Sequence, residues 1–260
     1  MDPSSQELES QNLSRDDYED TRTRFDDVCT EVAADYGLFY PNGKPRRALI
    51  IEVIAKTACT SCIDKILREK SNNHVDAFYA ECHLLACNIL VEELQVQLTE
   101  KGYSVLITTE KNLEYGKVDV QIVPNRGGVD LRLNNKEVGI EVKTGSSFSF
   151  SQLFRYMLDN VDRILILWRI RNKQILLFEG TKLKPVLTHF MKMIVSRAER
   201  LLSNREMSCD HASQGNLNWT PNQQQLQEAF SAFSDGIVKT LPSLIETVIA
   251  ILEGEETTDA

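Results

Sequence analysis

Residues 138–143 read Val138-Gly139-Ile140-Glu141-Val142-Lys143, a short β-prone run that carries one acid and one lysine. Because side chains alternate along a strand, Glu141 and Lys143 are predicted to project side by side from one face, with Val142 pointing the opposite way into packing. A charged pair on an otherwise apolar strand costs desolvation free energy unless it is paired or coordinates a ligand. The run therefore predicts a central strand that carries a functional pair.

A second acidic residue, Asp119, lies on a strand predicted at 117–123, within the sequence Gly116-Lys117-Val118-Asp119-Val120. Asp130, on a shorter strand predicted at 129–133, is the alternative acid. Two carboxylates can hold a hard divalent cation such as Mg²⁺, which binds phosphate oxygens and lowers the pKa of an attacking water. A lysine beside them can orient that water, so the set of side chains fits phosphodiester hydrolysis.

The periodicity around these strands predicts an α/β core. A helical pattern runs from His74 to Lys101 and stops at Gly102, a normal helix-ending glycine. Extended patterns follow at 103–108, 117–123, 129–133 and 137–143, then a helix at 149–160 and a hairpin at 163–170 and 174–178. The predicted order is helix, three to four strands, helix, strand.

The chain divides into five predicted parts. They are a disordered acidic tail at 1–24, a helical N-terminal extension at 25–79, the α/β core at 80–180, a helical C-terminal region at 181–253 and a disordered tail at 254–260. The last helical pattern has an apolar stripe that needs a partner, which suggests a homodimer or a DNA clamp. Pro242 is expected to kink or restart this helix.

Composition is that of a soluble globular protein, with 42% hydrophobic and 26% charged residues. The net charge of -9 is concentrated in the acidic ends, so the rest is close to neutral and does not argue against a nucleic-acid substrate. No apolar run approaches the roughly 20 residues of a membrane span, and the first residues are polar and acidic rather than a signal peptide. A cytoplasmic protein without membrane contact is expected.

Cysteine spacing offers a separate hypothesis, because Cys59 and Cys62 form a C-x-x-C pair that can bind zinc or an iron–sulfur cluster. The pair lies in a predicted amphipathic helix, where cysteine commonly serves as a small buried hydrophobe, and that interpretation is preferred. The histidines show no ligand spacing, and no phosphate-binding glycine loop of the ATPase type is present.

The core resembles the PD-(D/E)xK nuclease superfamily, whose first motif supplies an Asp and whose second supplies acid-x-Lys. The matching sequences are Gly116-x-x-Asp119, Glu141-Val142-Lys143-Thr144-Gly145 and Gln152-x-x-x-Tyr156, which resemble the RecB-like branch. The archaeal Holliday-junction resolvases are also similar, through the Ile-Glu-Val-Lys strand and a preceding glutamate-bearing helix. The iron–sulfur cysteines of some RecB-like nucleases are not reproduced, since only Cys209 follows the core.

This resemblance implies a restriction-endonuclease-like fold with added helices at both ends and a metal-dependent deoxyribonuclease activity. It implies that Asp119, Glu141 and Val142 bind Mg²⁺ or Mn²⁺ and that Lys143 assists the water. Gln152 and Tyr156 would position the backbone or the lysine. Glu92, or Glu81 two to three turns earlier, would be the helix carboxylate. DNA is the expected partner.

Each of these roles has a structural alternative. Glu141 and Lys143 can form a salt bridge on an edge strand, and Gln152 can close a capping box that begins at Ser149. Glu92 can be a solvated charge on its helix. A nuclease-fold protein that binds nucleic acid or a partner protein without cutting is the alternative function, although an intact Asp/Glu/Lys set favours the enzyme.

Overall fold

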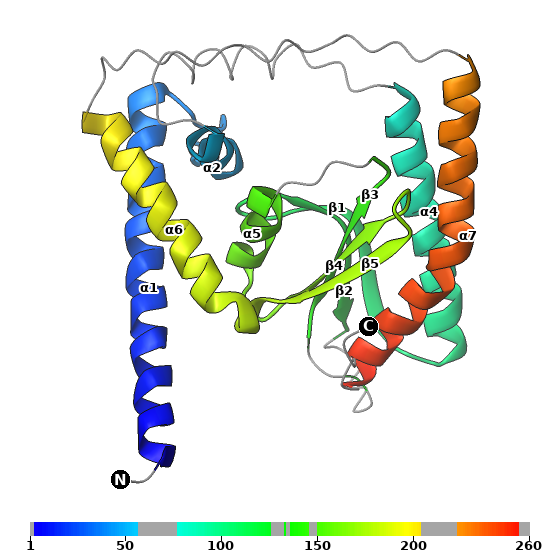
Figure 1. The fold of residues 1–260 in the computed structure, drawn as a ribbon, viewed down its shortest axis with the longest axis horizontal. Helices are drawn as coiled ribbons and strands as arrows, with labels where there is room; N and C mark the ends of the chain where they lie inside the picture. The colour runs from blue at the N-terminus through cyan, green and yellow to red at the C-terminus, as the bar shows by residue number, and fades with distance from the viewer. Residues whose placement is uncertain are drawn as a thin grey trace.

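The computed structural model describes residues 3–56, 77–125, 133, 136–145, 150–203 and 223–254. Within these ranges the chain forms an α/β protein, a five-stranded mixed sheet flanked by six helices (Figure 1). The helices are α1 (Pro3–Tyr36), α2 (Arg47–Lys56), α4 (Ala77–Glu100), α5 (Phe150–Asp159), α6 (Gly180–Ser203) and α7 (Gln223–Glu253). The strands are β1 (Val105–Asn112), β2 (Lys117–Pro124), β3 (Val138–Lys143), β4 (Ile164–Arg169) and β5 (Gln174–Glu179).

The predicted order of helix, strands, helix and strand is confirmed from α4 to β5, and the predicted α/β class with it. The strand predicted at 129–133 lies outside the described residues except for Leu133. Within the helical extension predicted at 25–79, α2 is described, whereas Cys59 and Cys62 lie outside the described ranges, as does the predicted tail beyond Gly254.

The strands are arranged in the order β1-β2-β3-β4-β5. All neighbours are antiparallel except β3 and β4, which are parallel and are connected through α5. Glu141 faces Leu167 across the parallel pair, and Lys143 faces Arg169. β3 is therefore a central strand with neighbours on both sides, and an edge-strand salt bridge does not describe its charged pair.

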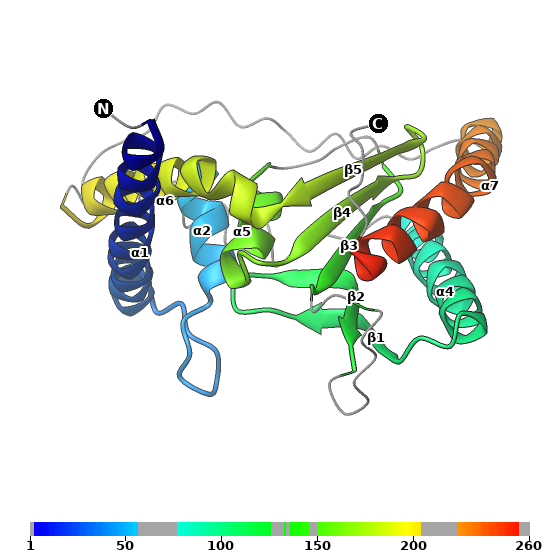
Figure 2. The same cartoon turned by 90° about the horizontal axis from the view of Figure 1, so that it is seen from below.

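The two faces of the sheet are covered by different helices (Figure 2). On one face lie α4 and α7, and on the other lie α1, α2, α5 and α6. Val138, Ile140 and Val142 of β3 pack on the α4–α7 side, which confirms the predicted inward direction of Val142. Because side chains alternate along a strand, Glu141 and Lys143 project toward the α5 side.

From Phe233 onward, most of the apolar stripe of α7 is buried within the chain, against α4 and the sheet. The indole Nε1 of Trp168 in β4 donates a hydrogen bond of 2.7 Å to Thr240 Oγ1 in α7. The helix continues through Pro242, and its ribbon changes direction along its length (Figure 1). Most of the stripe is covered without a second copy of the chain, whereas Phe230 near the start of the helix is 50% exposed, and the homodimer stays a prediction.

The α1 helix corrects the prediction of a disordered acidic tail at 1–24. It spans Pro3–Tyr36, and Tyr18 is only 3% exposed. Lys192 of α6 pairs with Asp17 at 2.8 Å. The acidic composition belongs to a long helix that lies against α6, because one packed face is enough to order a helix whose other side chains are polar.

The cysteines that the structure describes are buried, as expected of thiols that serve as small hydrophobic side chains. Cys29, Cys82 and Cys87 are free and buried among apolar side chains. None of the helices in the described part of the chain combines the length and apolar content needed to span a membrane.

Gly236 lets α7 approach the backbone of Ile170, the residue that follows β4, at close range. A Cβ atom at this position would collide with the backbone carbonyl of Ile170. Gly236→Ala is therefore expected to lower the free energy of unfolding by about 1–3 kcal/mol, the usual cost of overpacking a core. Urea unfolding followed by tryptophan fluorescence measures the change, with Gly145→Ala as control because open space surrounds Gly145. Equal midpoints for the two variants would contradict this packing.

Candidate active site

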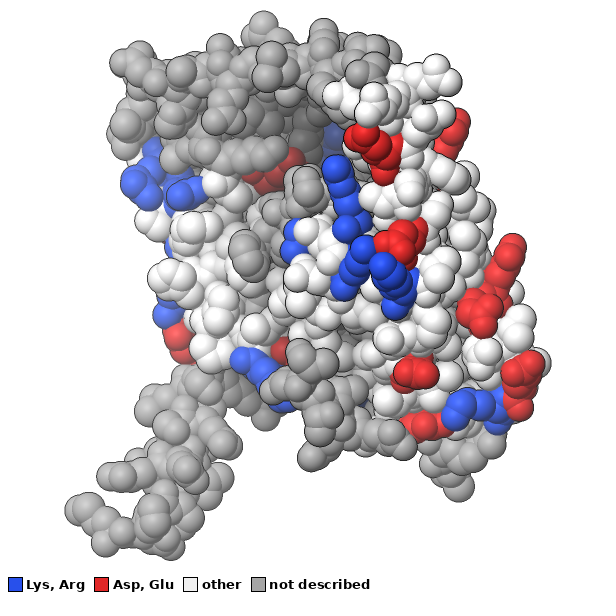
Figure 3. All heavy atoms as spheres, turned by 45° about the vertical axis from the view of Figure 1, so that its right-hand side comes forward, with Lys and Arg blue, Asp and Glu red and all other residues white. Residues whose placement is uncertain are grey.

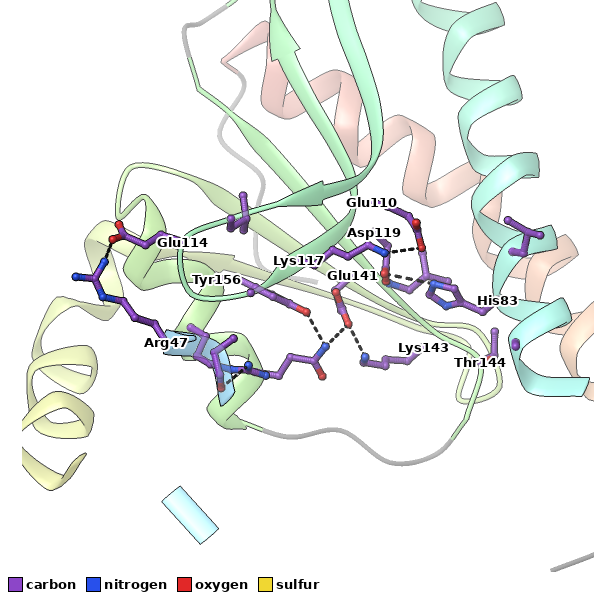
Figure 4. Close-up of a pocket in the computed structure, with 18 of the residues that line it drawn as sticks. Arg47, His83, Glu110, Glu114, Lys117, Asp119, Glu141, Lys143, Thr144 and Tyr156 are labelled. Atoms are coloured by element: carbon purple, nitrogen blue, oxygen red, sulfur yellow. Dashed lines mark hydrogen bonds and ion pairs between the residues drawn. The ribbon is translucent and has the colours of Figure 1, made fainter. Parts of the chain in front are cut away.

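A large open cavity lies between the segment before α2, the first turns of α4, and the β1–β2 and β3–α5 regions. Its volume is about 1860 Å³, which exceeds the roughly 300–1,000 Å³ of a typical small-molecule pocket. Asp119, Glu141, Val142, Lys143, Gln152 and Tyr156, all expected at the site from the sequence, line this cavity. Figure 4 shows Glu141 between Tyr156 and Lys143, with Asp119 and His83 beside it.

The β3 pair forms the floor of the cavity. The Glu141 side chain is 2% exposed and that of Lys143 is 20% exposed. The Lys143 ammonium donates a hydrogen bond to Glu141 Oε1, as the two-residue spacing on one strand face predicts. The other carboxylate oxygen, Oε2, is buried without a hydrogen-bond partner among the described residues. A buried, unsatisfied carboxylate oxygen is costly in free energy and marks a position for a ligand.

The electrostatic environment of Glu141 favours its neutral form. Burial raises the pKa of Glu141 to about 7, the nearby charge of Asp119 adds to the increase, and Lys143 opposes it. A cation bound between two carboxylates that repel each other would relieve both the repulsion and the cost of their burial.

Asp119 lies where the regular pairing of β2 is interrupted. The β1–β2 register passes from Thr109↔Val120 to Lys111↔Val118, and the β2–β3 register begins at Val120↔Ile140. Opposite the break, Glu110 adopts a left-handed φ of 51°, a conformation that a non-glycine residue rarely adopts without local strain.

The same break changes the direction of the β2 side chains. Val118 packs in the α5-side core, whereas Val120 packs in the α4-side core, so the strand alternation fails at Asp119. Asp119 Oδ2 accepts a 2.7 Å hydrogen bond from the backbone N–H of Val142. A local irregularity of this kind re-aims a side chain, and here it directs the Asp119 carboxylate to β3.

His83 of α4 is the site residue that the sequence analysis missed. Its Nε2 lies 3.3 Å from Asp119 Oδ1 and 3.7 Å from Cys87 Sγ. The hydrogen bond to Asp119 is the main cause that raises the pKa of His83 to about 10, with Cys87 adding to it. The imidazole is therefore positively charged and paired with Asp119 when no cation occupies the site.

The α5 helix holds the Glu141 carboxylate in place. Gln152 Nε2 donates to Glu141 Oε1 at 2.7 Å and to the Tyr156 hydroxyl at 2.6 Å. Gln152 and Tyr156 are four residues apart and share a helix face, as their sequence spacing predicts. Burial raises the pKa of Tyr156, so its phenol stays protonated at neutral pH. The side chain of Gln152 is thus part of the site, while Ser149, at which the alternative capping box begins, lies outside the described residues.

Gly116 makes room for the Tyr156 ring. A Cβ at Gly116 would lie 2.6 Å from Tyr156 Cε1, so only glycine lets the ring approach the start of β2 this closely. Arg155, the basic residue of α5, donates a hydrogen bond from Nη1 to the carbonyl of Ala48 at 3.0 Å and so links α5 to α2.

The structure does not bring the predicted helix carboxylate to the site. Glu92 and Glu81 are exposed on α4, and neither lines the cavity. The buried face of α4 is formed by Cys82, Ala86, Leu90, Leu94 and Leu98, which turns Glu92 away from the sheet. The alternative acid Asp130 and the position Ser149 lie outside the described ranges.

A divalent cation fits the donor set only in part. In the part of the chain that the structure describes, no group of three or more His, Cys, Asp or Glu side chains is arranged as a metal site. Two carboxylates and the free Oε2 of Glu141 suit a hard cation that keeps several waters. Val142, whose side chain is buried on the other face, can contribute only its backbone.

Comparison of the chain with protein-family models, with curated proteins and with solved structures found no match. The geometry of the cavity and the motif resemblance therefore carry the functional argument.

Proposed function

We propose that this protein is a metal-dependent nuclease that hydrolyses phosphodiester bonds in DNA, with a restriction-endonuclease-like core. The observation that carries the proposal is the floor of the cavity, where buried Glu141 with its unpartnered Oε2, Asp119 and Lys143 meet. The resemblance to the PD-(D/E)xK superfamily covers the same three residues. The size and openness of the cavity suit a polymer rather than a small molecule.

Asp119, Glu141 and the Val142 backbone would hold Mg²⁺ or Mn²⁺, and His83 stands next to Asp119 as a further donor. Imidazole suits zinc, copper, iron and nickel, whereas carboxylate, carbonyl and water ligands suit Mg²⁺ and Mn²⁺, so the two carboxylates would be the main ligands here. The bound cation would supply charge stabilisation at phosphorus and a more acidic water. For His83 to bind a metal, its Nε2 must be unprotonated and leave Asp119 Oδ1.

The remaining side chains would neutralise the phosphate charge and hold the Glu141 carboxylate in position. Lys143 presents an ammonium beside Glu141, where it can donate to a phosphate oxygen or to the attacking water. Gln152 donates to the same Glu141 oxygen as Lys143 and is itself hydrogen-bonded to Tyr156. A site held by strands and a helix has the rigidity that precise orientation of a reacting water requires.

One observation favours the non-catalytic alternative. Both Asp119 oxygens have partners within the chain, Oδ1 with His83 and Oδ2 with the Val142 N–H. A site closed in this way by an internal ion pair would bind nucleic acid or a protein without metal. Addition of metal separates the two functions, because only the nuclease needs a cation at Asp119.

Metal binding is tested by thermal unfolding. At saturating Mn²⁺, the Tm of the wild-type chain is expected to rise by roughly 5 °C, because a ligand that binds only the folded state stabilises it. Asp119→Ala should remove this increase, whereas Asp162→Ala, at an exposed position, should keep it. A Tm that does not respond to Mn²⁺ or Mg²⁺, combined with no cleavage of DNA, would support the non-catalytic binder.

A further inference from the structure

We propose that the loop before α2, through Tyr40 and Lys44, and the start of α4, through Tyr79, bind single-stranded DNA beside the Asp119–Glu141 floor. This inference rests on the proposed nuclease function and specifies its substrate. All three residues line the same cavity as the carboxylates. None of them belongs to the motifs on which the nuclease proposal is built.

The loop is a fixed hairpin. Phe39 and Pro45 form an isolated antiparallel bridge, and the Tyr40 N–H donates to the Lys44 carbonyl at 2.8 Å. The turn is closed by the Gly43 N–H, which donates to the Tyr40 carbonyl at 2.9 Å, and Gly43 adopts a φ of +79° that favours glycine. The backbone hydrogen bonds of the hairpin thus hold Tyr40 and Lys44 at the cavity edge, where both side chains are exposed.

Two tyrosines from distant parts of the chain line this cavity. Tyr40 is 48% exposed, which is high for a large aromatic side chain. Tyr79, from the first turn of α4, is partly exposed. Exposed aromatic rings in a cavity with a polar floor are what unpaired bases stack on, and such stacking tolerates any base sequence.

The cations of the cavity edge suit a phosphate backbone. Lys44 is exposed and forms no ion pair with any residue that the structure describes. Lys117 also lines the cavity, where it pairs with the exposed Glu110 at 2.7 Å. An unpaired lysine next to aromatic rings is the combination by which proteins follow single strands, since it neutralises phosphates while the rings hold bases.

A single strand fits this cavity better than a duplex. The scissile phosphate must reach Glu141, which is 2% exposed at the cavity floor. In a duplex the bases stack on one another and cannot stack on Tyr40 or Tyr79. A duplex would instead need an open basic surface. On the face in Figure 3, the described basic side chains form small groups with acidic side chains beside them and no continuous basic field.

The inference is tested by measuring DNA binding under conditions that prevent cleavage. Fluorescence anisotropy would measure the Kd of the full chain for labelled dT20 and for a labelled 20-base-pair duplex, in EDTA so that no metal-dependent cutting occurs. The wild-type chain should bind dT20 at least about 10-fold more tightly than the duplex. Tyr40→Ala and Tyr79→Ala should each weaken dT20 binding by about 10-fold, the usual effect of losing one stacking ring, and Tyr40→Phe should keep it within about 2-fold.

A matched lysine control distinguishes a specific contribution of Lys44 to DNA binding from the general effect of removing one positive charge. Lys44→Ala should weaken dT20 binding and flatten its salt dependence, whereas Lys182→Ala, at an exposed site away from the cavity, should change neither. Circular dichroism should show that every variant folds, because both tyrosines are outside the buried core.

Three outcomes would overturn the proposal: equal affinity for dT20 and duplex, tighter binding of rU20 than of dT20, or unchanged dT20 binding in Tyr40→Ala. These outcomes differ from failure of the nuclease function. Specific dT20 binding in EDTA with no cleavage in Mg²⁺ or Mn²⁺ would reject the nuclease and retain the single-strand site. Metal-dependent cleavage by the wild-type chain, combined with unchanged dT20 binding in Tyr40→Ala, Tyr79→Ala and Lys44→Ala, would reject the single-strand site and retain the nuclease.

Discussion

Lys143→Ala is expected to reduce metal-dependent cleavage of DNA by roughly 10²–10³-fold, the loss typical of one preorganised donor at a reacting centre. The physical reason is the position of the ammonium, which lies beside Glu141 at the floor of the cavity and is only 20% exposed. Cleavage of labelled single-stranded, duplex and branched DNA in Mg²⁺ or Mn²⁺ measures the effect. The preferred substrate also distinguishes a single-strand nuclease from a junction resolvase.

The stability of the variant is controlled separately. Loss of Lys143 leaves Glu141 without its counter-charge, so unfolding curves must show that the Lys143→Ala chain is folded at the assay temperature. Lys182→Ala, whose side chain is 75% exposed, is the matched lysine control and should cleave at the wild-type rate. Cleavage in Lys143→Ala at the wild-type rate would remove the lysine from the mechanism.

Glu141→Gln is expected to raise the Tm of the metal-free protein at pH 8 by roughly 5 °C and to have little effect near pH 4.5. Burial raises the pKa of Glu141 from 4.5 in an exposed chain to about 7 in the folded one. The folded state therefore holds this proton more tightly than the unfolded state. Ionisation of Glu141 costs stability progressively as the pH rises from 4.5 through about 7. Glutamine carries no charge at either pH and escapes that cost.

Thermal unfolding in EDTA across this pH range gives the comparison. Glu246→Gln, at an exposed position of α7, should show no such pH-dependent gain. Addition of Mn²⁺ should reverse the order, because the wild-type carboxylate then gains a cation that the glutamine cannot bind as well. A Glu141→Gln chain that is less stable than the wild type at pH 8 without metal would show that Glu141 is stabilised by its neighbours rather than strained by them.

The strand-based part of the site could be predicted because its periodicity is short and unambiguous. An acid and a lysine two positions apart share a face where the strand is regular, and Glu141 and Lys143 are in contact. The same holds for Gln152 and Tyr156, which are four apart on a helix and are joined by a hydrogen bond. Both relations follow from the local geometry of a regularly paired strand and a regular helix, which β3 and α5 are.

The helix-based part could not be predicted, because α4 carries apolar residues on more than one face. Leu85 and Val96, which made the Glu92 stripe look buried, are 44% and 50% exposed. The inner face lies on a different side of the helix, and it brings His83 to Asp119. A signal was present in the spacing of His83 and Cys87, one turn apart on that inner face, but periodicity alone cannot choose between two apolar stripes.

The interrupted pairing of β2 could not be predicted from the sequence either. Asp119 reads as an ordinary inward or outward position of a regular strand, whereas its direction is set by the interrupted pairing and by Glu110 in a left-handed conformation. Such irregularities depend on three strands at once, and no local pattern encodes them. The order of α1 was hidden for a related reason, since its packing partner α6 lies far away in the chain.

The position of α7 has a consequence for how the protein is made. Trp168 and its neighbours in β4 are covered by a helix that begins more than fifty residues later in the chain. At the usual ribosomal rate of about 5–20 residues per second, the part of this sheet face that α7 covers stays exposed for some seconds after β4 has been synthesised. During this interval the growing chain exposes a wide apolar surface, and a ribosome that stalls before α7 would leave an aggregation-prone chain in need of a chaperone.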